Sequence, residues 1–134
     1  MIKIAINGFG RIGRLVFKIM MEDDFFDVVA INDLSNSEEM AYLLKYDTNH
    51  RGYNKSVSFD DEGIVVDGKK IKVFAEKDPM LLPWKELGVD LVFECTGKFT
   101  KEEDAMKHIT AGAKKVLVSA PCKGNVKTIV YNVN

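Results

Sequence analysis

The stretch IKIAINGFGRIGRLVFKIMM, residues 2–21, decides the fold of this 134-residue chain. It opens with isoleucines at alternate positions, a pattern typical of a short β-strand, and then turns through three closely spaced glycines. Beyond them, apolar residues recur at helical spacing, and we expect one face to be buried. That predicted apolar face consists of Ile12, Leu15, Val16, Ile19 and Met20. The stretch therefore predicts a strand, a glycine turn and a helix in immediate succession.

The turn has the spacing G-x-G-x-x-G, which is a weak signal alone but a strong one between a strand and a helix. Gly8 would permit the tight turn, Gly10 would let a diphosphate approach the backbone, and Gly13 would let the helix pack against the strand. The N–H groups near Arg11 and Ile12 would then point at the phosphates, assisted by the positive end of the helix dipole. This stretch predicts a dinucleotide-binding turn.

An acidic residue stands where such a turn requires one. Residues 28–31, VVAI, read as a second buried strand, and Asp33 follows it, 20 positions after Gly13 (33 − 13 = 20). A carboxylate there would accept hydrogen bonds from the adenosine ribose and repel a 2′-phosphate. We therefore predict NAD rather than NADP as the cofactor.

Strand and helix signals continue to alternate along the rest of the chain. Ser35 and Glu38 have the spacing of a helix capping box, and Asp67-Gly68 is a two-residue hairpin signal. Further strands are expected at 89–95, 116–118 and 128–133, and a helix at 100–111 that Gly112 ends. The pattern predicts an α/β fold of the Rossmann type, doubly wound, with a mainly parallel sheet and a small antiparallel insertion.

Composition limits the classes of protein to which the chain can belong. With 46% apolar and 29% charged residues, it is typical of one globular domain spanning 1–134. A net charge of −1 argues against nucleic acid as a partner, and no apolar run is long enough to span a membrane. Without a signal-peptide pattern and with only two cysteines, we expect a cytoplasmic protein.

The segment AINGFGRIGR, residues 5–14, resembles the N-terminal signature of the glyceraldehyde-3-phosphate dehydrogenase family. Asn32-Asp33 is similar to that family's ribose-binding pair. Further matches occur in order along the whole chain: LLKYD at 43–47, DP at 78–79, LPW at 82–84, ECTG at 94–97, SAP at 119–121 and TIVYNVN at 128–134. The resemblance identifies the chain as the NAD-binding half of a phosphorylating dehydrogenase of glycolysis.

The resemblance implies additional cofactor contacts. Lys77 would lie beside the adenine, Thr96, Gly97 and Phe99 would line the adenosine side of the cleft, and Ser119 with Ala120 would approach the nicotinamide ribose. It also implies a homotetrameric parent enzyme, whereas the chain by itself would expose apolar surface and could self-associate.

The resemblance places the catalytic cysteine and its histidine beyond residue 134, in a catalytic domain that this chain lacks. We therefore expect the chain alone to be inactive, with no catalytic residue of its own. Cys122 is an unsuitable substitute because no histidine is placed to act as its base, and Cys95 is expected to be an inert core residue. His50 and His108 lack partners at metal-ligand spacing, so no metal site is predicted, and His108 is expected on a helix with a solvated face.

Two alternatives remain at this point. The chain could be the same domain of an erythrose-4-phosphate dehydrogenase, which shares most of these motifs. It could also be a stand-alone NAD-binding or nucleotide-binding module with no catalytic role.

Overall fold

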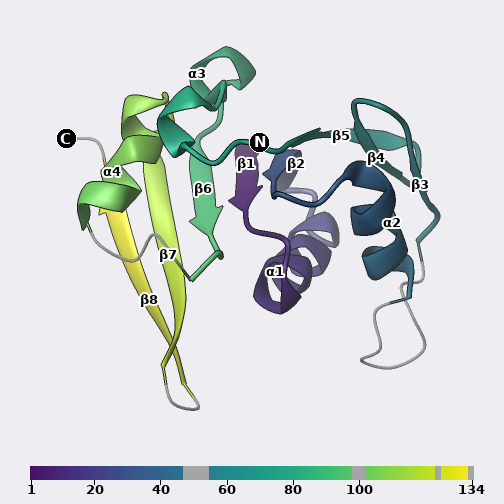
Figure 1. Ribbon diagram of the computed structural model, residues 1–134, viewed down its shortest axis with the longest axis horizontal. Helices are drawn as coiled ribbons and strands as arrows, with labels where there is room; N and C mark the ends of the chain where they lie inside the picture. The colour runs from purple at the N-terminus through teal and green to yellow at the C-terminus, as the bar shows by residue number, and fades with distance from the viewer. Residues whose placement is uncertain (47–54, 98–101, 123–124, 133–134) are drawn as a thin grey trace.

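Within the described residues of the computed structural model, which are 1–46, 55–97, 102–122 and 125–132, one sheet of eight strands runs through the molecule (Figure 1). The strands are β1 (Ile2–Asn7), β2 (Phe26–Asn32), β3 (Val57–Phe59), β4 (Gly63–Val66), β5 (Lys69–Phe74), β6 (Leu91–Glu94), β7 (Lys115–Cys122) and β8 (Asn125–Asn132). The helices are α1 (Arg11–Met21), α2 (Ser37–Lys45), α3 (Trp84–Leu87) and α4 (Glu102–Thr110), with a 3₁₀ turn, η1 (Pro79–Leu81).

The strand order is β3-β4-β5-β2-β1-β6-β7-β8. The five central strands, from β5 to β7, are parallel, and β1 lies between β2 on one side and β6 on the other. The chain therefore reverses its winding direction beside β1, which is where a doubly wound sheet leaves a crevice at its carboxyl edge. The predicted Rossmann-type fold is confirmed.

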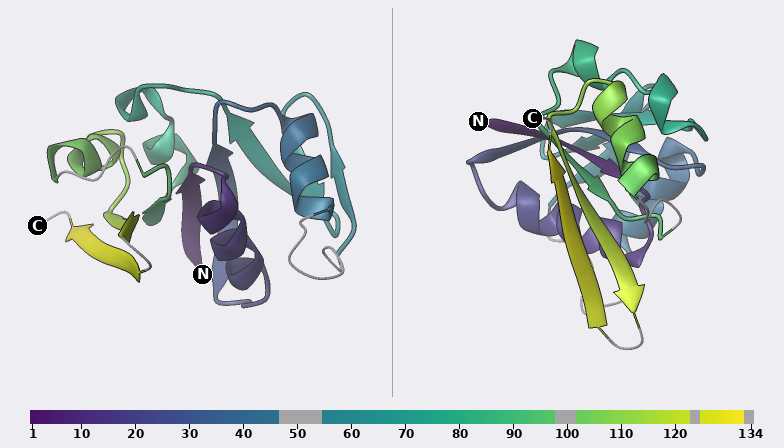
Figure 2. Two further views of the ribbon diagram at one scale, coloured as in Figure 1. Left: turned by 60° about the horizontal axis from the view of Figure 1, so that its bottom comes forward. Right: turned by 90° about the vertical axis from the view of Figure 1, so that its left-hand side faces the viewer.

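Antiparallel strands extend both edges of this sheet. The predicted insertion is present: β3, β4 and β5 pair antiparallel, and the Asp67-Gly68 turn has both φ angles positive, at 47° and 82°. Positive φ at both central residues is the geometry of the tight hairpin turn that the sequence predicted. At the other edge, β7 and β8 form a long antiparallel ribbon, which Figure 2 shows extending beyond the rest of the sheet. The sequence indicated the last strand but not its direction.

The sheet buries both of its faces. Because successive side chains of a strand point to opposite sides, Ile4 and Ile6 lie in one buried cluster and Ala5 lies in another. The first cluster contains residues of α1 and α2, and the second contains Trp84 of α3 and Ala105 of α4. Two helices therefore cover each face, as a doubly wound domain requires.

The predicted apolar face of α1 is partly wrong. Phe17 and Gly13 are the residues of α1 that are buried, whereas Leu15 and Ile19 are 58% and 53% exposed. An α-helix turns by about 100° per residue, so Leu15 lies about 200° from Gly13 and faces away from the sheet. Apolar residues surround much of this helix, and their spacing alone did not indicate which of them meet β1.

The start of α2 also differs from the prediction by one residue. Asn36, not Ser35, is the N-cap, and its side chain accepts the backbone N–H of Glu39 at 2.8 Å. The Ser35 hydroxyl instead donates to Asp33. A single turn of helix after Pro83 is present as α3, and α4 ends before Gly112, whose φ is +118°.

Candidate cofactor-binding site

The glycine bend connects the end of β1 to the start of α1 at the carboxyl edge of the sheet. The Gly8 N–H donates to the Asn32 carbonyl at 2.7 Å, and Gly8 has a φ of +97°. A Cβ atom at Gly8 would come within 2.8 Å of the Thr96 backbone nitrogen. Gly8 is thus required both by its conformation and by the close approach of the loop that follows β6.

The other two glycines of the bend have contrasting surroundings. A Cβ at Gly13 would lie 2.0 Å from the Gly8 carbonyl oxygen, so helix and bend are in direct backbone contact there. A Cβ at Gly10 would meet no atom of the described residues within 4 Å, because Gly10 faces open space. Gly13 therefore allows the helix and the bend to pack closely, while Gly10 leaves its backbone accessible from the cleft.

The first turn of α1 has no side-chain cap. Gly10 is its N-cap residue and has no side chain that could accept a hydrogen bond, whereas α2 and η1 are capped by the side chains of Asn36 and Asp78. The first intrahelical bond is donated by Arg14, so the preceding N–H groups open toward the bend. An uncapped N-terminus of an 11-residue helix favours an anion at this position.

Asp33 lies directly against the bend. Its Oδ1 accepts the Phe9 N–H at 2.8 Å, and its Oδ2 accepts the Ser35 hydroxyl at 2.6 Å and the Ser35 N–H at 3.1 Å. Partial burial acts to raise the pKa of Asp33, but these hydrogen bonds, helped by the charge of Arg14, outweigh it and lower the pKa below its usual 3.8. The side chain is therefore held as a carboxylate at the edge of the cleft.

A cleft of about 670 Å³ joins these elements. Its lining residues are Asn7, Gly8, Gly10, Asn32, Asp33, Leu34, Glu76, Lys77, Cys95 and Thr96. The cleft therefore brings together six residues predicted from the sequence: Gly8, Gly10, Asn32, Asp33, Lys77 and Thr96.

Four further predicted residues are described but are not among that lining. Arg11, Ile12 and Gly13 form the first turn of α1, and exposed Gly97 follows Thr96 with a φ of +74°. Ser119 and Ala120 belong to β7, but their side chains, like Phe99 and His50 as a whole, lie outside what the structure describes.

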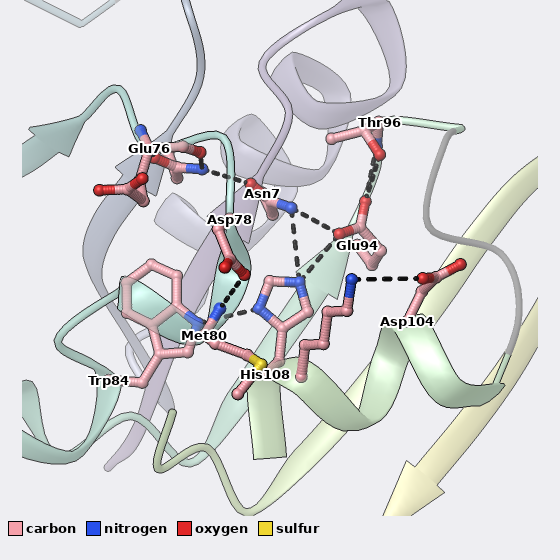
Figure 3. A network of polar contacts seen from close by, with 11 residues as sticks. Asn7, Glu76, Asp78, Met80, Trp84, Glu94, Thr96, Asp104 and His108 are labelled. Carbon is pink, nitrogen blue, oxygen red and sulfur yellow. Dashed lines mark hydrogen bonds and ion pairs between the residues drawn. The ribbon is translucent and has the colours of Figure 1, made fainter. Parts of the chain in front are cut away.

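Below the cleft, a buried group of polar side chains was missed by sequence reasoning. Glu94 at the end of β6 and His108 on α4 are almost fully buried, and His108 Nε2 lies 2.9 Å from Glu94 Oε1 (Figure 3). The expectation of a solvated position for His108 is therefore wrong. His108 lies three residues after buried Ala105, so the two side chains share the inner face of α4.

Cys95 occupies the loop immediately after β6 rather than the strand itself, and it lines the cleft. Burial, reinforced by the neighbouring Glu94 carboxylate, raises the pKa of its thiol to about 12. The thiol is therefore protonated near neutral pH, and a protonated thiol is a poor nucleophile.

The described part of the chain offers no group of three or more histidine, cysteine or acidic side chains that could hold a metal ion. In that same part, every helix is too short or too polar to cross a bilayer.

Comparison with known proteins agrees with the site. Residues 2–102 match the family model described as glyceraldehyde 3-phosphate dehydrogenase, NAD binding domain. The chain is 54% identical over 134 residues to the glyceraldehyde-3-phosphate dehydrogenase of Clostridium pasteurianum, covering all of this chain and 40% of that protein. Over 136 residues it is 52% identical to the enzyme of that name from Thermotoga maritima, covering all of this chain and 41% of the relative. For the Mycoplasma pneumoniae enzyme the identity is 51% over 134 residues, with coverage of 99% and 40%.

The chain spans about two-fifths of the length of these relatives. The matched family model covers most of the chain, including the glycine bend, Asp33 and the loop after β6. Sheet order, bend and sequence agree: the chain belongs to the family of NAD-binding domains of glyceraldehyde 3-phosphate dehydrogenase.

Proposed function

We propose that the chain binds NAD in the cleft at the carboxyl edge of its sheet and acts as the cofactor domain of a phosphorylating glyceraldehyde-3-phosphate dehydrogenase. In this proposal the N–H groups at the start of α1 bind the diphosphate, and the Asp33 carboxylate accepts hydrogen bonds from the adenosine ribose. Lys77, Thr96 and Gly97 contact the adenosine half. Phe99, Ser119 and Ala120 complete the set by resemblance to the family.

The observation that carries this proposal is the contact between Asp33 and the bend. Asp33 Oδ1 accepts the Phe9 N–H at 2.8 Å, so the carboxylate adjoins the uncapped start of α1. The start of the helix can bind the negatively charged diphosphate of a dinucleotide, and the adjacent carboxylate can accept hydrogen bonds from the ribose. A ribose carrying a 2′-phosphate would instead meet like charge at Asp33, which favours NAD over NADP.

Calorimetric titration of NAD and NADP into the wild type and Asp33→Asn tests this assignment. The asparagine retains an oxygen that can accept the Phe9 N–H but removes the charge. We expect the Kd for NAD to rise about tenfold, which corresponds to about 1.4 kcal/mol for a hydrogen bond to a charged group. The preference for NAD over NADP should narrow as well.

Asp24→Asn is the matched control. Asp24 is exposed and precedes β2, whereas Asp33 follows it, so the same change of charge is made at the opposite end of the strand. The control should bind both cofactors as the wild type does. If Asp33→Asn and Asp24→Asn had equal effects on the two affinities, the role proposed for Asp33 would be refuted.

The reaction of the complete protein is part of the same proposal. The relatives described above are named for glyceraldehyde 3-phosphate, which favours this substrate over erythrose 4-phosphate. NAD, held by the glycine bend, Asp33 and the loop after β6, would supply the hydride acceptor for oxidation of the aldehyde, while a cysteine thiolate elsewhere in the protein would serve as nucleophile and phosphate would take up the acyl group. A higher kcat/KM for erythrose 4-phosphate in the complete protein would contradict this choice.

A further inference from the structure

A continuous chain of hydrogen bonds crosses the carboxyl ends of four parallel strands directly below the cleft. The last residues of β1, β2 and β6 are Asn7, Asn32 and Glu94, and the Asn32 amide donates to the Asn7 side-chain oxygen at 2.8 Å. The Asn7 amide in turn donates to Glu94 Oε1. At the far end, the Asn32 side chain both donates to and accepts from the Glu76 backbone, at 2.9 and 2.8 Å, just beyond β5.

His108 connects this chain to the helical layer, and its hydrogen bonds determine which ring nitrogen carries the proton. Trp84 Nε1 lies 3.0 Å from His108 Nδ1 (Figure 3). An indole N–H can only donate, so Nδ1 must accept. The proton of the neutral ring therefore resides on Nε2, from which it is donated to Glu94 Oε1 at 2.9 Å.

The Glu94 carboxylate is surrounded by donors. Its Oε1 accepts from Asn7 and His108, and its Oε2 accepts from the Thr96 N–H at 2.9 Å and the Thr96 hydroxyl at 2.6 Å. A carboxylate with 1% exposure requires such partners, because an unpaired buried charge is costly. Removing the donor on one oxygen would allow the carboxylate to turn, and the turn would displace Thr96 on the other.

We propose that His108, which lies below the cleft and is not among the described residues that line it, is a positioning residue for the cofactor. Through Nε2 it fixes the Glu94 carboxylate, which in turn fixes the Thr96 backbone and hydroxyl and the Asn7 amide in the wall and floor of the cleft. Thr96 also packs against Gly8, so the same carboxylate aligns the loop after β6 with the glycine bend. This role rests on the proposed binding of NAD in the cleft.

Two substitutions at position 108, which introduce amide side chains of different length, distinguish the positioning role from ordinary structural support. His108→Gln places an amide N–H near the position of Nε2 and keeps the donor to Glu94. His108→Asn places the same amide near Nδ1, so that it faces Trp84 and does not reach Glu94. Trp84→Phe retains an aromatic ring but removes the indole donor on the far side of His108.

Measurements on the complete protein are the Kd for NAD by calorimetry, KM for NAD and kcat, and the melting temperature. We expect His108→Asn to raise the Kd and KM for NAD about tenfold, the factor for one hydrogen bond to a charged group, with a smaller change in kcat. The Kd of His108→Gln and of Trp84→Phe should stay within about twofold of the wild type, even where the melting temperature falls.

Equal Kd values for His108→Asn and His108→Gln would overturn the proposal, as would affinities that follow the melting temperatures of all three variants. If His108→Asn does not fold, Glu94→Gln provides the second comparison, because its amide would direct an N–H at one of the four donors. Glu94→Gln with wild-type affinity would also overturn the proposal. Wild-type protein that binds no NAD would instead refute the proposed function, so the two failures are distinguishable.

Discussion

Alanine substitutions at Gly13 and Gly10 should separate folding from cofactor binding within a single turn of α1. At Gly13 the added Cβ would lie 2.0 Å from the Gly8 carbonyl oxygen, more than 1 Å closer than an ordinary contact of about 3.4 Å. Backbone cannot rotate out of the way as a side chain can. The start of α1 must therefore move away from β1, which disturbs the packing of fully buried Phe17.

The magnitude follows from the cost of overpacking a rigid interior. Overpacking costs about 1–3 kcal/mol, and because both partners at Gly13 are backbone we expect about 3 kcal/mol or more. For a chain of 134 residues this lowers the melting temperature by about 10 °C. At Gly10 the backbone has a φ of −77° and a ψ of −158°, which alanine also adopts, and the space is open. Gly10→Ala should therefore cost less than about 1 kcal/mol.

The affinity for NAD should not follow the stability of the two variants. Although Gly10→Ala is almost as stable as the wild type, its methyl group occupies the space into which the diphosphate is proposed to approach, so its Kd should rise at least about tenfold. Thermal melting with and without saturating NAD, together with calorimetry, measures both quantities. The reasoning is refuted if Gly13→Ala has the melting temperature of the wild type or if Gly10→Ala binds NAD with unchanged affinity.

Two further predictions follow from the titrating groups of the cleft. Because burial raises the pKa of Cys95 to about 12, iodoacetamide should leave this thiol unmodified in the native protein at about pH 7.5 and alkylate it after denaturation, as read by peptide mass spectrometry. Rapid native labelling of the Cys95 peptide would contradict the burial that we describe. The lowered pKa of Asp33 means that the unfolded state binds more protons near its usual 3.8, so the stabilising contribution is complete above about pH 4 and is lost as the pH falls through the folded-state pKa. The difference in unfolding free energy between wild type and Asp33→Asn should be constant from about pH 5 to 8 and shrink below about pH 4, and a difference that grows on acidification would disprove this linkage.

Features encoded by local sequence were predictable. The glycine spacing after an isoleucine-rich strand and the acid 20 residues later gave the bend and Asp33, which the fold brings to 2.8 Å from each other. Asp67-Gly68 gave its hairpin because few residue pairs tolerate two consecutive positive φ angles. In each case the conformation depends on neighbours in sequence.

What could not be predicted depends on partners far apart in the chain. His108 stands among charged residues in the sequence, and only the approach of α4 to β6 shows that it faces Glu94 and Trp84. The side of α1 that meets the sheet is likewise set at Gly13, where an added Cβ would lie 2.0 Å from the Gly8 carbonyl oxygen. The direction of β8 depends on the ribbon it forms with β7, for which no turn signal was recognised.

The hydrogen bonds around Asn7 constrain the order in which this domain can fold during its synthesis. Glu94, which accepts from the Asn7 amide, is synthesised 87 residues after Asn7, and His108, which donates to the same carboxylate, is synthesised 101 residues after Asn7. The hydrogen-bonded group below the cleft is therefore complete only after α4 has emerged, and we expect NAD to protect the chain only from that point. Ribosome-bound chains arrested shortly before and well after His108 emerges should differ in protease resistance with NAD, and equal protection of both by NAD would show that the floor of the cleft forms without α4.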